Sequence, residues 1–264
     1  MAMVRLLAYL TILASFWESV TGAFVDIEKP AIRQSCRDFQ LSFRPKSQSR
    51  QRSQPALVRF SSRNHDETHR LPSLIIFDLD GCLWRPEMYE LLYFSGGAGS
   101  PFRKSPNYSQ DGTLLTCKGE PVRLLGQVRE IMQDLYCNTD KWRNTRVGIS
   151  SRTNQPDWAR ELLQKFTIDT DMQNKECFSL KYVFLGPIEI QSDSKVSHFR
   201  RISSATGVAM QDILFFDNEM GNCREVAKLG VVVGYCPDGV TKRIWDHCIQ
   251  LFPTASGKVL GLDV

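Results

Sequence analysis

Two aspartates that lie two residues apart are the first sign of chemistry in this chain. Asp78 and Asp80 follow the apolar run Leu74-Ile75-Ile76-Phe77, and Gly81 comes next. Neighbouring carboxylates repel one another, and burying them is costly unless a cation is present. Acidic turns after strands are common, but the apolar run before the pair and the glycine after it favour a cation site. Gly81 suits the sharp turn that would fold Asp80 back toward Asp78.

Three further segments supply groups that complement the two aspartates. The hydroxyl of Ser151, with backbone amides beside it, suits phosphate oxygens, although it also suits the cap of a following helix. Lys195 begins a predicted helix whose N-terminus favours an anion, although a lysine alone is more often a solvated surface residue. Asp217-Asn218-Glu219 can complete a magnesium site with Asp78, because Mg²⁺ prefers oxygen ligands. The order of the four segments along the chain makes their joint signal strong.

Alternating strands and helices are expected to position these groups. The apolar runs predict strands over 74–77, 146–150, 181–185, 213–216 and 231–235. The helical spacing of apolar residues predicts helices over 122–136, 157–166, 195–205, 222–228 and 239–252. This alternation implies an α/β fold with an open, doubly wound parallel sheet flanked by helices. The active site of such a sheet lies beyond the carboxyl ends of its strands, where the polar candidates fall.

The order of motifs resembles that of the haloacid dehalogenase (HAD) superfamily. An apolar strand before DxDG, a strand ending in Ser or Thr, a lysine and a strand ending in acidic residues follow one another there as they do here. The resemblance narrows to its magnesium-dependent acid phosphatase family, whose FDLDxTLW is similar to residues 77–84 of this chain. It extends over about residues 72–250, through the segments 101–105, 111–112, 151–153, 194–199, 215–217 and 229–231.

This resemblance implies a magnesium-dependent phosphomonoester hydrolase with a covalent intermediate. Asp78 would attack phosphorus to form an aspartyl-phosphate, and Asp80 would protonate the leaving oxygen and then activate water. Ser151 and Lys195 would hold the transferring phosphoryl group, and Arg152 would contact the substrate.

The cofactor implied by the resemblance is Mg²⁺. Its ligands would be a side-chain oxygen of Asp78, the backbone oxygen of Asp80, and the segment after the fourth strand, Asp217 and Asn218. The family has a pair of aspartates at the last two positions, and the second of them is usually assigned as the ligand. A neutral amide therefore replaces a charge here, unless Asp217 has become the primary ligand. Cys82 replaces a usual threonine and is expected to be a small buried packing residue.

An open site is expected, because the family has little or no cap domain. The interval between Asp80 and Ser151 leaves room for only a small flap, around Tyr89 to Gly119. Phosphotyrosine on proteins, sugar phosphates and phosphates on glycated amines are all compatible substrates. Asn218 motivates a second hypothesis, a catalytically impaired phosphate-binding module, and transfer to an acceptor other than water is a third. We expect a monomer.

The N-terminal segment has the composition of a targeting sequence. Residues 1–23 combine Arg5, a short apolar stretch and a small-residue end, which predicts a cleaved secretory signal. Residues 24–70 are basic and rich in serine, lack sustained periodicity, and are expected to be disordered. The two parts together resemble the presequences of secondary plastids. We therefore expect the phosphatase domain, residues 71–264, to reach the plastid stroma, with secretion or an endomembrane destination as the alternative.

Charge and cysteine content exclude other classes of protein. The formal net charge is +4, but residues 71–264 carry 22 Lys and Arg against 23 Asp and Glu, so the basic excess lies in the N-terminal segment. We therefore expect neither a nucleic-acid partner nor a membrane association of the mature form. The eight cysteines form no CxxC pair, which favours free thiols in a reducing compartment.

Overall fold

A computed structural model describes residues 70–94, 96, 99–170 and 176–262. The expectations for residues 1–69 lie outside these described residues. The described residues belong to one compact unit. No helix among the described residues has the length and apolar character needed to cross a membrane.

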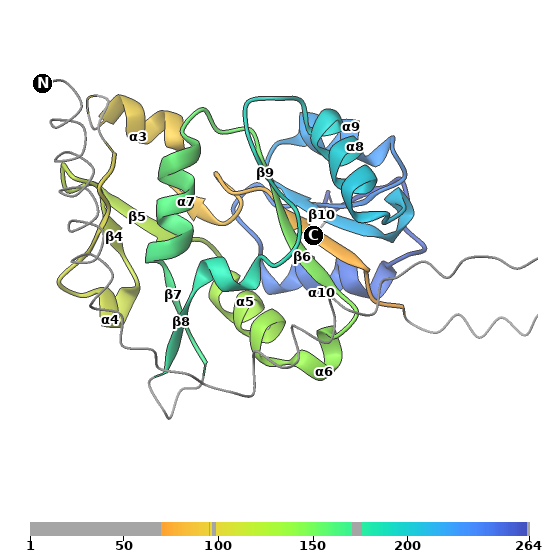
Figure 1. Cartoon of the computed structure of the whole chain (residues 1–264), viewed down its shortest axis with the longest axis horizontal. Coiled ribbons are helices and arrows are strands. Elements are labelled where there is room, and N and C mark those ends of the chain that lie inside the picture. The colour runs from red at the N-terminus through yellow and green to blue at the C-terminus, as the bar shows by residue number, and fades with distance from the viewer. Residues whose placement is uncertain (1–69, 95, 97–98, 171–175, 263–264) are drawn as a thin grey trace, which may run out of the picture. The chain divides into compact units, whose positions relative to one another are not determined.

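A parallel sheet forms the centre of this unit, as predicted (Figure 1). Its order is β12-β11-β10-β1-β6-β9, and every neighbouring pair is parallel. The bounds of its strands are β1 (Leu74–Phe77), β6 (Arg146–Ser151), β9 (Ile188–Ile190), β10 (Ile213–Asp217), β11 (Val232–Tyr235) and β12 (Val259–Leu260). If the six strands of this sheet are numbered 1 to 6 as they occur along the chain, their order across the sheet is 3-2-1-4-5-6, as in doubly wound folds. The direction of this order changes between β1 and β10. The polar residues after β1 and β10 therefore meet where such folds bind ligands.

Helices cover both faces of the sheet. Alternate residues of β1 point to opposite sides, so Ile75 and Phe77 join one apolar cluster while Leu74 and Ile76 join the other. Figure 1 shows α8 and α9 over one face and α5 and α10 over the other. The α-helices that follow the flap in the described residues are α5 (Val128–Cys137), α6 (Thr139–Trp142), α7 (Pro156–Lys165), α8 (Lys195–Thr206), α9 (Met220–Ala227) and α10 (Lys242–Leu251).

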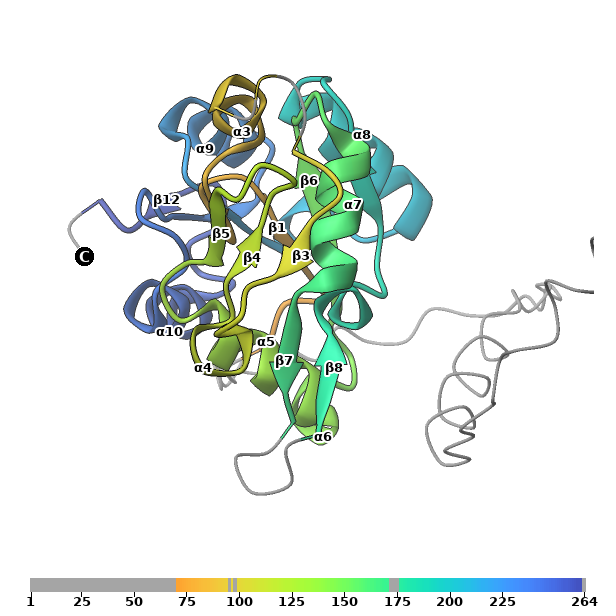
Figure 2. The same ribbon diagram turned by 90° about the vertical axis from the view of Figure 1, so that its left-hand side faces the viewer.

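The flap expected between β1 and β6 is a small antiparallel sheet with two short helices. Its strands run in the order β2-β5-β4-β3, and Figure 2 shows β3, β4 and β5 side by side in front of the central sheet. The bounds are β2 (Trp84–Arg85), α3 (Met88–Phe94), β3 (Arg103–Lys104), α4 (Tyr108–Asp111), β4 (Leu114–Leu115) and β5 (Pro121–Leu124). The hairpin β7 (Thr167–Asp169) and β8 (Cys177–Ser179) adds a separate pair of strands.

The predicted helix over 122–136 is wrong in its first part. Val122 lies in β5 opposite Leu114, and the helix begins only at Val128. Gly126 separates the two elements with a φ of +46°, and a Cβ there would lie 2.7 Å from the carbonyl oxygen of Val240. The apolar residues at the start of the range therefore belong to a half-buried strand, not to the helix.

The predicted strand over 181–185 is also wrong. Residues Leu180–Val183 form a 3-10 helix, and the third strand of the sheet is β9. The buried residues Leu180, Val183 and Phe184 have the spacing of one helical turn, so they reach the core from one side of a turn. The backbone joins the sheet at Gly186, whose N–H donates to the carbonyl of Val147 at 2.8 Å.

Candidate active site

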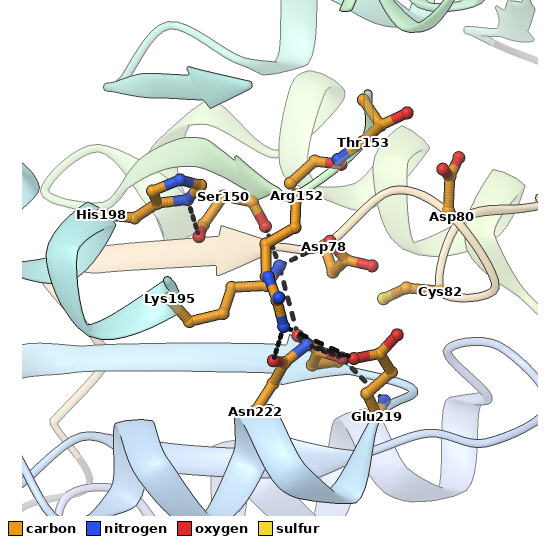
Figure 3. Close-up of polar contacts among 12 residues, drawn as sticks. Asp78, Asp80, Cys82, Ser150, Arg152, Thr153, Lys195, His198, Glu219 and Asn222 are labelled. Atoms are coloured by element: carbon orange, nitrogen blue, oxygen red, sulfur yellow. Dashed lines mark hydrogen bonds and ion pairs between the residues drawn. The ribbon is translucent and has the colours of Figure 1, made fainter. Parts of the chain in front are cut away.

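A pocket of about 250 Å³ opens at the predicted edge of the sheet. Five of the seven predicted site residues line it, namely Asp78, Asp80, Ser151, Arg152 and Lys195. Of its other lining residues, Glu219 belongs to the acidic segment expected at the magnesium site, whereas five were not predicted: Glu87, Tyr89, Thr153, Asn154 and Asn222. Figure 3 shows Asp78, Lys195 and Asn222 converging from the end of β1, the start of α8 and the first turn of α9.

Lys195 ties the first and fourth sheet strands together at the base of the pocket. Its ammonium lies 2.6 Å from Asp78 Oδ1 and 3.2 Å from Asp217 Oδ2, and it also donates to the carbonyl oxygen of Ser150. The side chain is 1% exposed, so three oxygens replace the water that it loses. Ser194 caps α8 by accepting from the N–H of Ser197, which fixes the helix start that presents Lys195. The expectation of a solvated lysine is thereby excluded.

The same ion pairs decide the protonation of Lys195. Burial alone would lower its pKa, but the carboxylates of Asp78 and Asp217 outweigh burial and raise this pKa above its usual value. Burial raises the pKa of Asp78, and the ammonium of Lys195 opposes that rise. Lys195 therefore stays a cation at neutral pH and provides the positive charge that an attacking carboxylate or a phosphate oxygen needs.

Asp80 is held away from Lys195 by the start of the flap. Trp84 Nε1 donates to Oδ1 at 2.9 Å, and the N–H of Met88 donates to Oδ2 at 3.2 Å. Burial raises the pKa of Asp80 to about 6, while these hydrogen bonds limit the rise. A carboxyl group with such a pKa can both give and take a proton near neutral pH, as a general acid and base must.

The end of β6 and the residues that follow it form one wall of the pocket. Ser151 is buried, and its Oγ accepts weakly from the N–H of Thr153 at 3.4 Å. Arg152 is half exposed and donates to Asn222 Oδ1 at 3.1 Å, with Glu219 Oε2 4.0 Å away. The guanidinium therefore stands at the rim, where it can meet the part of a substrate outside the phosphate group.

Asp217 does not line the pocket. Its carboxylate accepts from Asn222 Nδ2 at 3.1 Å and from the N–H of Glu219 at 2.7 Å, in addition to its pairing with Lys195. These hydrogen bonds fix the carboxylate of Asp217 in the position where it pairs with the ammonium of Lys195. Asn222 also donates to Glu219 Oε2 at 2.9 Å, so it links the buried carboxylate to the rim. Asn222 lies five residues after Asp217, on the first turn of α9. This spacing is the sequence feature that could have identified it as a site residue.

Asn218 lies beside the turn that carries Asp78 and Asp80, outside the pocket lining. Its Nδ2 donates to Glu87 Oε1 at 3.3 Å. A Cβ on Gly81 would lie 2.2 Å from the same nitrogen, so the glycine makes room for this amide. Burial raises the pKa of Glu87, and the charges of Asp80, Glu90 and Glu219 raise it further. Glu87 was missed because only the fold brings the flap next to the loop after β10.

The donor set fits magnesium. No group of three or more His, Cys, Asp or Glu side chains in the described ranges is arranged to hold a metal ion. Asp78 and the backbone of Asp80 nevertheless offer oxygens around one turn, to which the amide of Asn218 presents its nitrogen. Mg²⁺ is commonly held by one or two carboxylates, with water and substrate phosphate filling the remaining positions. The assignment of Asp217 or Asn218 as its ligand stays a prediction.

Comparison with known proteins agrees with this chemistry. The acid phosphatase family model matches residues 70–255. Magnesium-dependent phosphatase 1 of Homo sapiens is 28% identical over 190 residues, which cover 70% of this chain and 90% of that protein. A HAD-like hydrolase superfamily protein of Schizosaccharomyces pombe is 29% identical over 162 residues, covering 61% of this chain and 83% of that protein.

Solved structures include a predicted HAD-like family hydrolase from Porphyromonas gingivalis. It is 15% identical, covers 69% of this chain and 99% of that chain, and has a TM-score of 0.41. The family model, by contrast, spans nearly all of the described residues and includes every pocket residue named above. The chain therefore belongs to the acid phosphatase family, the magnesium-dependent phosphatases of the HAD superfamily.

Proposed function

We propose that this phosphatase hydrolyses phosphomonoesters through an aspartyl-phosphate formed on Asp78. The observation that carries the proposal is the contact of 2.6 Å between Asp78 and the buried ammonium of Lys195. A carboxylate placed at the base of a pocket beside a fixed cation is oriented toward an incoming anion, and the cation offsets their repulsion. Asp80, two residues along, has the proton-transfer properties that the reaction needs.

The two steps balance as follows. A carboxylate oxygen of Asp78 forms a bond to phosphorus while the bond from phosphorus to the ester oxygen breaks, and the leaving oxygen takes the proton of Asp80. Asp80, now ionised, accepts a proton from a water molecule that attacks the same phosphorus. The acyl-phosphate bond then breaks, which releases inorganic phosphate and restores Asp78 as a carboxylate.

The remaining pocket groups bind and orient the phosphoryl group. Ser151 and Lys195 would hold its oxygens at the base, and Arg152 would contact the substrate at the rim. Asp78 and the backbone oxygen of Asp80 would hold Mg²⁺, together with Asp217 or Asn218. When bound, the metal ion supplies positive charge that lessens repulsion between the phosphate and the nucleophile.

The rim favours an ester whose leaving group extends out of the pocket. Tyr89 is 61% exposed and lines the pocket on the flap side, and the side chain of Arg152 is 49% exposed on the other side. An aromatic face and a guanidinium suit a leaving group that is planar or carries hydroxyls. Phosphotyrosine, sugar phosphates and phosphates on glycated amines meet this description, and a phosphoester panel on the full chain would rank them.

The direct test is to trap the covalent intermediate. The full chain is incubated with p-nitrophenyl phosphate and Mg²⁺, quenched, and treated with hydroxylamine, which converts an aspartyl-phosphate into a hydroxamate that mass spectrometry locates. We expect the modification on Asp78 and its loss in Asp78→Asn. Hydrolysis without any modified aspartate would contradict the mechanism.

The same incubation separates the two alternative functions. Absence of turnover under all Mg²⁺ concentrations would indicate an impaired phosphate-binding module. Turnover that requires an added alcohol would indicate transfer to an acceptor other than water. Light scattering on the active sample checks whether the active species is the monomer that we propose.

We also propose that residues 1–23 direct the chain into the secretory route and that residues 24–70 direct onward import into the plastid stroma. The support is the sequence pattern alone. A fluorescent fusion of residues 1–70, expressed in an alga with secondary plastids, is expected to label the plastid. Phe24→Ala is expected to divert it without blocking entry into the secretory route. Fluorescence of the unchanged fusion in the medium or vacuole would contradict the proposal.

A further inference from the structure

Ser150 is held by the start of α8 at both of its polar groups. Its carbonyl oxygen accepts from the ammonium of Lys195, and its hydroxyl lies 3.0 Å from His198 Nδ1 (Figure 3). Lys195 and His198 are three residues apart in α8, so they lie on the same side of the helix. Two contacts therefore join the first turn of α8 to the end of β6.

This junction carries both groups that would hold the phosphoryl oxygens at the base of the pocket. Lys195 supplies the ammonium, and Ser151 follows Ser150 directly in β6. Both side chains are buried, so the backbone on which each stands fixes its place. A misplacement of about 1 Å can slow an enzyme by about 10²-fold. The register of β6 against α8 therefore matters for how the two groups meet one phosphate.

His198 makes its contact with Ser150 as a neutral ring. The side chain is fully buried, and burial, with the charge of Lys195, lowers its pKa to about 4. A neutral imidazole places no second positive charge beside the ammonium of Lys195. The ring therefore contributes a hydrogen bond to the junction without repelling the lysine.

The other ring nitrogen makes no such contribution. Nε2 of His198 is buried and has no hydrogen-bond partner among the described residues. An unpaired polar atom in the interior costs free energy that an apolar side chain of similar size would avoid. The hydrogen bond at Nδ1 is thus the one feature of this ring that an apolar residue could not supply.

We propose that His198 is a positioning residue for phosphate: its hydrogen bond to Ser150 fixes the end of β6 against α8, so that Ser151 and Lys195 meet the same phosphoryl group. His198 does not line the pocket and acts through Ser150 alone. The inference rests on the proposed function, in which Ser151 and Lys195 hold the phosphoryl oxygens.

The test measures the binding of inorganic phosphate to the full chain at saturating Mg²⁺, by titration followed with ³¹P nuclear magnetic resonance. A dissociation constant does not depend on the fraction of protein that is folded, so a loss of stability alone leaves it unchanged. We expect His198→Leu to raise the dissociation constant of phosphate by about tenfold, the factor that corresponds to the loss of one buried hydrogen bond.

Two amide variants separate the hydrogen bond from the volume of the ring. The amide atoms of asparagine are bonded to Cγ, as Nδ1 is, so His198→Asn can pair with Ser150 whichever group is the donor. The amide atoms of glutamine lie one bond further out, as the unpartnered Nε2 does. We expect His198→Asn to stay within about threefold of the unchanged protein and His198→Gln to lose affinity as His198→Leu does.

A double-mutant cycle identifies the contact, and a second variant in α8 serves as the control. Ser150→Ala should weaken phosphate binding by about the same factor as His198→Leu, and the double variant by no more than either single variant. Ile202→Val removes one buried methyl group one turn later in the same helix. We expect it to lower thermal stability and to leave the dissociation constant within about threefold.

Ser151→Ala reports on the phosphate site itself. If the unchanged protein binds no phosphate, or if Ser151→Ala binds it as tightly, the proposed phosphate site is wrong and the role of His198 falls with it. Where Ser151→Ala does weaken binding, three outcomes overturn only the role of His198. These are an unchanged affinity in His198→Leu, an equal loss in His198→Asn, and additive losses in the cycle with Ser150→Ala. Thermal unfolding shows whether each variant is folded, and His198→Gln replaces His198→Leu if that variant is not.

Discussion

The buried ammonium of Lys195 provides the most quantitative prediction for this fold. Lys195→Met keeps most of the side-chain volume but removes the charge that lies 2.6 Å from Asp78 and 3.2 Å from Asp217. At an effective dielectric near 20, the two attractions are worth about 6 and about 5 kcal/mol. The substitution also removes the cost of burying the ammonium, which is several kcal/mol. We expect a net loss of about 3–5 kcal/mol, the range found when one partner of a buried ion pair is removed.

The assay is urea unfolding of the full chain at pH 7, followed by circular dichroism. A change in midpoint at an unchanged m-value would identify a change in stability and not in the compactness of either state. The matched control is Lys242→Met. Lys242 pairs with Asp246 on the surface, where the two side chains are 56% and 58% exposed, and we expect a loss below about 0.5 kcal/mol.

The pH dependence supplies an independent check. Without Lys195, nothing opposes the effect of burial on Asp78, so its folded pKa rises further above its unfolded value. The folded state then binds a proton that the unfolded state does not, and the cost of the substitution shrinks as the pH falls through the folded pKa. A loss below about 1 kcal/mol at pH 7, or a loss that grows on acidification, would refute this electrostatic reasoning.

Three further predictions concern single residues. Asp80→Asn is expected to slow steady-state hydrolysis of alkyl phosphates and of p-nitrophenyl phosphate by about 10²–10⁴-fold, because the second step needs Asp80 as a base with either ester. With p-nitrophenyl phosphate, whose leaving group needs no proton, the aspartyl-phosphate is expected to accumulate, and a burst of p-nitrophenol before the slow steady state checks this. His198 is buried, and its Nδ1 lies 3.0 Å from Ser150 Oγ. Burial lowers the pKa of His198 to about 4; the charges of Lys195 and Arg201 lower this pKa further, and those of Glu189 and Asp193 oppose the change. The unfolded state therefore takes up a proton near pH 6.5 that the folded state does not bind until about pH 4, so the free energy of unfolding falls by at most about 3 kcal/mol between these two pH values. His198→Gln should make the urea midpoint less dependent on pH over this range. Gly81→Ala is expected to lower stability by more than about 1 kcal/mol, measured by the same unfolding, because its φ is +69° and its Cβ would strike Asn218.

The central strands and the pocket residues were predictable because each signal was local. A four-residue apolar run before Asp78 specifies a strand buried on both faces, and β1 has the predicted bounds. The carboxyl ends of parallel strands share one edge, so knowing the strands was enough to expect Asp78, Ser151 and the start of α8 together. The two wrong elements have apolar patterns that suit either a strand or a helix, and only their packing partners distinguish them.

Contacts between segments far apart in the chain were not predictable. Glu87 and Asn218 are 131 residues apart, and their contact depends on the place of the flap against the loop after β10. The role of Asp217 was likewise hidden, because an acidic residue at a strand end suits both a metal ligand and a partner of a buried lysine. Only the position of the Lys195 ammonium, 3.2 Å away, favours the second role.

The charges of the pocket explain why a phosphatase of this design needs a divalent cation. Among the described residues that line the pocket, four are acidic (Asp78, Asp80, Glu87 and Glu219) and two are basic (Arg152 and Lys195). Lys195 already forms ion pairs with Asp78 and Asp217 at the base of the pocket. A phosphate dianion would therefore enter a pocket whose net negative charge repels it. A bound divalent cation would cancel this excess of two negative charges where the phosphate must lie. By linkage, the phosphate must strengthen the binding of the metal by the same factor, so each ligand alone should bind more weakly than in the other's presence.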